Sequence, residues 1–85
     1  MRLDKFLKVS RLIKRRTVAN EACDAGRVEV NGRVAKAGAE LKIGDEIAIR
    51  FGGKTVKYRV LALDEHVLKT DAQGMYEILG VQEHE

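Results

Sequence analysis

The 85 residues are enough for one small globular domain, and no apolar run of eighteen residues is present that could span a membrane. The opening residues are charged and lack a signal peptide's apolar stretch, and Cys23 is the only cysteine, so we expect a cytoplasmic protein without an intramolecular disulfide. The net charge is only +3, but residues 1–16 carry +6 and the rest sum to −3. This asymmetry favours a basic face for a polyanion over the alternative of a solvated helix face.

Apolar residues at helical spacing predict two short helices at the start of the chain. The first is expected over residues 2–9 and the second over about 15–25, with Thr17 as a possible cap and Gly26 as a left-handed stop. The apolar face of the first helix consists of Leu3, Phe6 and Leu7. The stripe of the second consists of Val18, Ala19, Ala22 and Cys23.

Alternating apolar residues predict short strands in the middle of the chain. Val28 and Val30 lead into an Asn31-Gly32 pair, which is a strong hairpin signal, and residues 33–36 would form the return. Two further strands are expected on either side of the Gly52-Gly53 turn. Their alternating apolar positions are Ile47, Ile49 and Phe51, then Val56, Tyr58 and Val60.

The end of the chain is expected to be helical, because its apolar residues fit helical spacing. These residues are Ala72, Met75, Tyr76 and Leu79, with Thr70 placed to cap them. Residues 81–85 are expected to be a frayed tail. The predicted fold class is α+β: two short N-terminal helices packed on a small antiparallel β-structure, with a short C-terminal helix, all in a single domain over residues 1–80.

Side chains that carry catalysis or bind metals are scarce. His66 and His84 have no Cys, His or Asp neighbours at metal-ligand spacing and are expected on the surface. Cys23 lies on an apolar stripe, which predicts a buried and unreactive thiol. The Gly52-Gly53 pair lacks the upstream glycine of a phosphate-binding loop. We therefore expect no catalytic residue, no metal and no cofactor, and a protein that is not an enzyme.

The basic cluster of residues 1–16 is the main functional signal. Arginine can clamp two phosphate oxygens, lysine adds a point charge, and the start of the second helix adds backbone N–H groups. Thr17 and Asn20 can add neutral hydrogen bonds, while Asp4 either orders the cations or favours the start of its helix. Aromatic residues are too few for a stacking platform, so folded RNA is favoured over single strands; charge alone does not exclude DNA.

The order of "RLDKFL", Arg16, a short helix, "GRVEVNGRVAKAG" and "GDEI" resembles the S4-type RNA-binding domain over about residues 1–51. The resemblance implies a helix pair on a small β-structure that docks on structured RNA. Lys14 and Arg15 stand where family members often have a Ser or Thr cap. The basic cluster and the resemblance together give the candidate RNA-binding residues Arg2, Asp4, Lys5, Lys8, Arg11, Lys14, Arg15, Arg16, Thr17, Asn20, Asn31 and Lys36.

Nearly the whole chain, including "MYEIL", also resembles a family of small bacterial ribosome-associated quality-control proteins, which is related to the ribosome-binding heat-shock proteins. This resemblance implies a factor that binds large ribosomal subunits obstructed by peptidyl-tRNA, contacts 23S rRNA and the peptidyl-site tRNA, and supports alanine tailing by a partner protein. We expect a monomer that does not associate with membranes. The alternatives are a heat-shock type recycling factor for large subunits, an RNA-binding accessory subunit of an RNA-modifying enzyme, a constitutive ribosomal protein and a DNA-binding regulator.

Overall fold

Two helices precede five strands in the computed structural model, which describes residues 1–84. The helices are α1 (Leu3–Val9) and α2 (Arg16–Asp24), and a 3-10 helix, η1 (Lys69–Met75), precedes the last strand. The strands are β1 (Val28–Val30), β2 (Arg33–Val34), β3 (Glu46–Phe51), β4 (Lys54–Val60) and β5 (Tyr76–Glu83). The predicted α+β fold class is confirmed. No helix within residues 1–84 is both long and apolar enough to cross a membrane.

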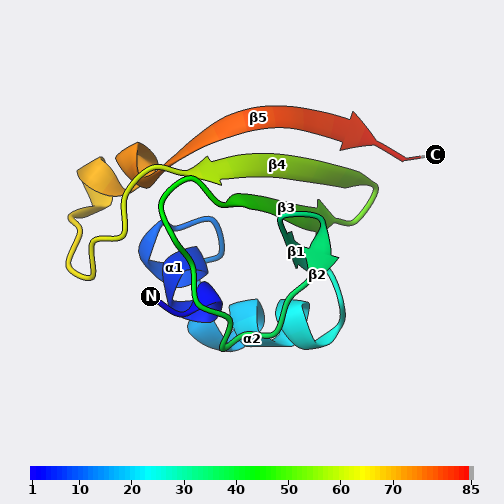
Figure 1. The fold of residues 1–85 in the computed structure, drawn as a ribbon, viewed down its shortest axis with the longest axis horizontal. Helices are drawn as coiled ribbons and strands as arrows, with labels where there is room; N and C mark the ends of the chain where they lie inside the picture. Colours follow the sequence, from blue (N-terminus) through cyan, green and yellow to red (C-terminus); the bar gives the residue numbers. More distant parts are fainter. Residues whose placement is uncertain (85) are drawn as a thin grey trace.

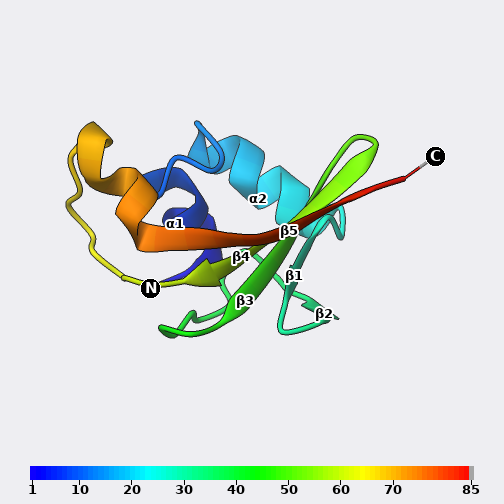
Figure 2. The ribbon, with the colours of Figure 1, turned by 90° about the horizontal axis from the view of Figure 1, so that it is seen from above.

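The strands form one antiparallel sheet in the order β2-β1-β3-β4-β5. The β1–β2 hairpin turns at Asn31 and Gly32, whose φ angles of 52° and 83° are the positive values that a type I′ turn requires. The turn prediction is therefore confirmed, and so are the strands on both sides of Gly52-Gly53. Figure 1 shows α1 and α2 together on one face of this sheet, and Figure 2 shows η1 beside α1 at one end.

The core fills the space between the helix pair and the sheet. Its largest fully buried apolar side chains are Phe6, Leu3, Leu7, Ile47, Ile49, Met75, Val28 and Val60. Burying each of these side chains contributes about 1.5–3 kcal/mol relative to leaving it in water. The apolar face predicted for the first helix is thus buried against the sheet, and the opposite sides of both helices are left to solvent.

The start of α1 is fixed by the loop at residues 36–39. The backbone N–H groups of Leu3 and Asp4 donate to the carbonyl oxygens of Ala39 (2.8 Å) and Ala37 (3.1 Å). These bonds satisfy donors that would otherwise be orphaned in the first turn of a helix. The loop therefore lies against the end of α1 that carries Asp4.

The C-terminal helix prediction is wrong beyond Met75. Ala72 and Met75 are buried, as expected, but they belong to η1, and Thr70 lies inside η1 rather than capping a helix. Tyr76 begins β5, where it pairs with Val60, and Leu79 lies on the strand. Tyr76 also meets Tyr58 edge to face, with ring centroids 5.3 Å apart. The sheet pairing and this aromatic contact replace the expected helix.

The frayed-tail prediction is wrong for residues 81–83, because Val81, Gln82 and Glu83 pair with Val56, Thr55 and Lys54 of β4. His84 continues the contact through a backbone N–H that donates to the Gly53 carbonyl (2.7 Å). The last position of that predicted tail, residue 85, lies outside the described residues. The strand β5 therefore forms one edge of the sheet along most of its length.

Candidate nucleic-acid interface

Asp4 stands at the centre of a group that joins the two helices. Its carboxylate, only 3% exposed, accepts hydrogen bonds from Arg2 Nε (3.2 Å), Arg16 Nε (3.3 Å) and Asn20 Nδ2 (3.4 Å). The Nη2 atoms of Arg2 and Arg16 add longer bonds of 3.4 Å each, and the backbone N–H of Lys5 donates a further bond of 2.8 Å. Arg16 and Asn20 lie on α2, so one carboxylate links both helices to the residue before α1. We call Arg2, Asp4, Arg16 and Asn20 the arginine cluster.

The charge of Asp4 is held by its partners against the effect of burial. Burial alone would raise its pKa, but the hydrogen bonds from Arg16 and Arg2, the charge of Arg16 and the Asn20 amide outweigh burial and bring the pKa below its ordinary 3.8. Asp4 is therefore ionised at neutral pH. The contacts show that Asp4 orders cationic side chains, and its place in the first turn of α1, where it accepts the Lys5 N–H, also fits the second role considered for it.

Each arginine keeps part of its guanidinium free for another acceptor. The side chains of Arg2 and Arg16 are 50% and 48% exposed. Both use Nε and Nη2 toward Asp4, and a guanidinium has five N–H donors. The cluster thus presents two planar cations in fixed orientations to solvent, which suits bidentate contacts to phosphate oxygens.

Lys36 lies beside the arginine cluster, but Asn31 does not. Lys36 is exposed in the loop whose Ala37 carbonyl binds the Asp4 backbone, and Gly38 of the same loop lies against the Arg2 guanidinium. Asn31 is used within the protein: its Nδ2 donates to Asp45 (3.1 Å), and its Oδ1 accepts the Glu46 N–H (3.0 Å). Asn31 therefore ties the hairpin turn to the start of β3.

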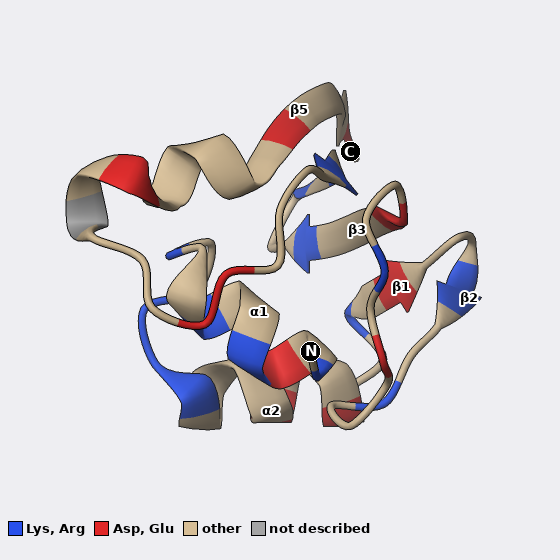
Figure 3. Ribbon diagram, turned by 60° about the vertical axis from the view of Figure 1, so that its left-hand side comes forward, with Lys and Arg blue, Asp and Glu red and all other residues tan. Residues whose placement is uncertain are grey.

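The remaining candidate residues at the start of α2 are exposed. Arg15 occupies the N-cap position, and no side chain caps the helix there, so the prediction that Thr17 caps α2 is wrong. Thr17 is instead a first-turn residue whose side chain faces solvent. In Figure 3 the blue segments of α1, of the connection after it and of the start of α2 lie next to one another.

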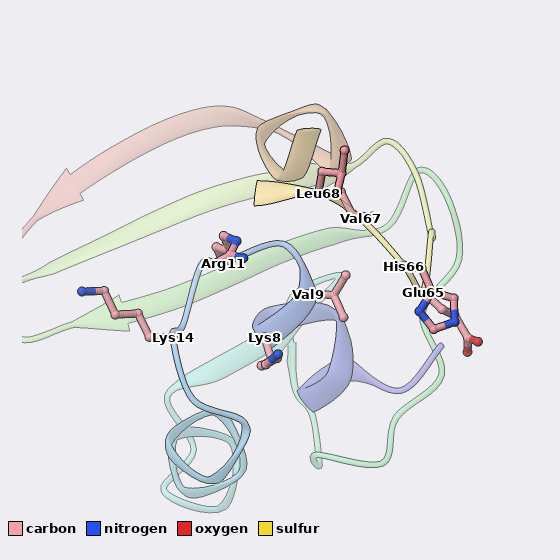
Figure 4. A pocket seen from close by; sticks show the side chains of 8 residues that line it. All are labelled: Lys8, Val9, Arg11, Lys14, Glu65, His66, Val67 and Leu68. Carbon is pink, nitrogen blue, oxygen red and sulfur yellow. The ribbon is translucent and has the colours of Figure 1, made fainter. Parts of the chain in front are cut away.

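A second cationic region lies along α1 and the connection to α2. This basic pocket has a volume of about 380 Å³ and is lined by Lys8, Val9, Arg11, Lys14, Glu65, His66, Val67 and Leu68. Figure 4 shows its two sides, with Lys8 and Val9 on α1 and His66 on the facing segment. Arg11 has a φ of 63°, an uncommon value for a residue with a side chain, and its N–H donates to the Lys8 carbonyl (3.1 Å).

Lys5 connects the arginine cluster with the basic pocket. It follows Asp4 on α1, and its Nζ lies 3.1 Å from the Glu65 carboxylate on the rim of the pocket. From the sequence, His66 is expected only to lie on the surface, and no functional role is predicted for Glu65 or His66. Sixty residues separate Lys5 from Glu65, so no local pattern could have shown that this turn folds back on α1.

The cysteine and the two histidines differ in their access to solvent. Cys23 is 2% exposed, as predicted, and burial, with smaller contributions from Asp4 and Asp24, raises its pKa to about 11. His66 and His84 are exposed, also as predicted. Within residues 1–84, no three His, Cys, Asp or Glu side chains gather as a metal site would require.

A helix pair on a sheet, with arginines fixed by a buried carboxylate and half open to solvent, has the features of a small nucleic-acid-binding module. The S4 domain family model matches residues 1–47, so the chain belongs to the S4 domain family. The match includes the whole arginine cluster and Lys36 but ends before the segment that carries Glu65 and His66.

Similarity to known proteins continues beyond the matched domain. A Streptococcus pneumoniae protein named RQC P-site tRNA stabilizing factor is 56% identical, over 94% of this chain and 91% of its own. A protein of the same name from Halalkalibacterium halodurans is 59% identical, over 92% of this chain and 89% of its own. Among solved structures, a trimeric heat shock protein 15 from Vibrio cholerae has a TM-score of 0.85 and 29% identity, covering 92% of this chain and 80% of that one.

Proposed function

We propose that this protein is a non-catalytic, cytoplasmic RNA-binding factor of ribosome-associated quality control, which binds the obstructed large ribosomal subunit and stabilises peptidyl-tRNA in the peptidyl site. Residues 1–80 would act as one RNA-binding domain. Its partners would be 23S rRNA, the peptidyl-tRNA and the protein that adds alanine to the stalled chain. The 56–59% identity to proteins named RQC P-site tRNA stabilizing factor favours this function over that of the heat shock protein, which is 29% identical.

The observation that carries the proposal is the Asp4-centred pair of arginines within the matched S4 domain. Two guanidinium groups that are already oriented lose less side-chain entropy on contact with RNA than two free ones would. The neighbouring cations of the basic pocket and the start of α2 add attraction for the phosphate backbone. All the candidate residues except Asp4, Lys5 and Asn31 would face the RNA. Asp4 and Lys5 would hold the interface in shape, and Asn31 would hold the hairpin turn.

A factor of this kind would act by selective binding. A protein that binds one arrangement of subunit and tRNA more tightly than the others shifts the population toward that arrangement, whereas equal affinity for all of them shifts nothing. Stabilising peptidyl-tRNA therefore requires no reacting group on this chain. It requires that the cationic surface fit rRNA and tRNA together better than it fits the empty subunit. We expect one copy to act as a monomer on each subunit.

Affinity purification of the tagged protein from growing bacteria tests this function. We expect the recovered large subunits to be enriched in peptidyl-tRNA relative to the bulk subunits of the same cells. The Arg16→Ala protein, purified in parallel at equal expression, should recover few subunits. Equal recovery of all large subunits, with or without peptidyl-tRNA, would instead indicate a constitutive ribosomal protein and contradict the proposal.

A further inference from the structure

The segment before η1 forms one wall of the basic pocket, although it lies outside the matched S4 domain. Residues 64–68 run beside α1, and the ion pair from Lys5 to Glu65 (3.1 Å) joins them to the helix. His66, Val67 and Leu68 line this wall, opposite Lys8 on α1. The chain therefore adds to its helix pair a second wall of the pocket that Lys8, Arg11 and Lys14 also line (Figure 4).

The pocket combines two kinds of lining that suit one nucleotide. Lys8, Arg11 and Lys14 supply positive charge, while Val9 and Leu68, which is 72% exposed, supply apolar surface. Cations hold a phosphate, and an apolar wall accepts the face of a base or a ribose. We propose, resting on the function proposed above, that this pocket receives one unpaired nucleotide of the bound RNA, with its phosphate on the cations, its base against Leu68 and a hydrogen bond from His66.

Glu65 is the one acidic residue among the described residues that line the pocket, and its charge would repel a phosphate. The hydrogen bond and the charge of Lys5 hold the pKa of Glu65 below its ordinary 4.5, so the carboxylate is ionised at neutral pH and its charge is offset by a neighbouring cation. Lys5 supplies that cation. Lys5 is therefore a positioning residue, which neutralises Glu65 and keeps residues 64–68 against α1, rather than a direct contact to RNA.

The two histidines of the chain offer a matched test of the pocket. His84 lies at the other end of the sheet, where its Nε2 is 2.8 Å from Thr55 Oγ1. His66→Ala should weaken binding to purified large ribosomal subunits about threefold to tenfold, the range for the loss of one hydrogen bond, while His84→Ala should change binding less than about twofold. Equal affinities of the two variants would overturn the proposal that the basic pocket binds RNA. Failure of the wild-type protein to bind large subunits would overturn the proposed function instead.

A double variant separates the positioning role of Lys5 from direct contact. Lys5→Ala should weaken subunit binding because it frees the Glu65 carboxylate. Glu65→Gln should bind slightly more tightly than wild type, and Lys5→Ala/Glu65→Gln should recover most of the affinity lost in the single Lys5 variant. A double variant as weak as Lys5→Ala would show that Lys5 touches RNA itself, and would overturn the positioning role.

Nuclear magnetic resonance titrations with two probes identify what the pocket accepts. Pentauridylate, a short unpaired RNA, should shift the backbone amide signals of Val9, His66 and Leu68. Inorganic phosphate at the same concentration should shift signals near Lys8 and Arg11 and leave Leu68 unchanged. Equal shifts of the Leu68 signal with both probes would show that the pocket binds phosphate alone, and would overturn the proposal that it binds a nucleotide. The absence of shifts around the pocket with pentauridylate would overturn it as well.

Discussion

The arginine cluster and the basic pocket are both cationic, but they hold their cations differently. Arg2 and Arg16 are oriented by a buried carboxylate that contacts both. Within residues 1–84, the side chains of Lys8, Arg11 and Lys14 form no ion pair that would orient them. The cluster therefore presents cations in a fixed orientation, whereas the cations of the pocket attract phosphate through their charge. Substitutions that disturb geometry should be costly in the cluster and mild in the pocket.

Removing Asp4 should have the largest effect. Asp4→Ala leaves two arginines without their shared partner and removes a polar link between α1 and α2, so the free energy of unfolding should fall by about 1–3 kcal/mol. Subunit binding should fall with it, because the guanidinium groups lose their orientation. Urea denaturation and co-sedimentation with large subunits measure the two effects. Asp71 is exposed, so Asp71→Ala is the matched control. Equal stability of the two variants would contradict a structural role for Asp4.

The stabilisation by Asp4 should depend on pH in one direction. The pKa of Asp4 is lowered in the folded protein, so the ionised form is favoured by folding, and the stabilisation is full above the unfolded value near 3.8. It is lost as the pH falls through the lower folded value. The difference in unfolding free energy between wild type and Asp4→Asn should thus be constant above about pH 5 and shrink below the unfolded value. If the difference in unfolding free energy grew as the pH fell, the pKa of Asp4 could not be lowered by folding.

Replacing an arginine of the cluster by lysine, and a lysine of the pocket by arginine, should show whether binding depends on the shape of the cation or only on its charge. Arg16→Lys keeps the charge but loses the planar fork that contacts Asp4, and it should weaken subunit binding by about tenfold. Lys14→Arg keeps the charge in the basic pocket and should change binding by less than about twofold. Equilibrium binding at constant ionic strength measures both variants. Similar losses in the two would indicate that the arginines of the cluster, like the cations of the pocket, contribute charge alone.

The predictable parts of the fold are those whose signals lie close together in the sequence. The helical spacing of Phe6 and Leu7 predicts the buried face of α1, and the Asn31-Gly32 pair predicts the β1–β2 hairpin turn. Neither prediction depends on residues that are distant in the sequence. The strand β5 carried no such signal. Residues 77–83 are exposed on both sides of the strand, so apolar and polar residues do not alternate, and the spacing of Met75 and Tyr76 with their neighbours imitated a helix.

The candidate site was predictable in composition but not in arrangement. Positive charge in residues 1–16 marked the surface, because clustering is visible in the sequence. The role of Asp4 depends on Arg16 and Asn20, which are 12 and 16 residues away on another helix, and that of Glu65 on a contact across sixty residues. Only the packing of α1 on α2, and of residues 64–68 on α1, brings these groups together.

The affinity of single-alanine variants for purified large ribosomal subunits tests the arginine cluster most directly. Arg50 is exposed on β3 and serves as the matched arginine, since its side chain lies away from the cluster. Arg2→Ala and Arg16→Ala should each weaken binding about tenfold or more, whereas Arg50→Ala should stay within about twofold of wild type. Equal affinities for all three variants would contradict the assignment of RNA binding to the helix pair.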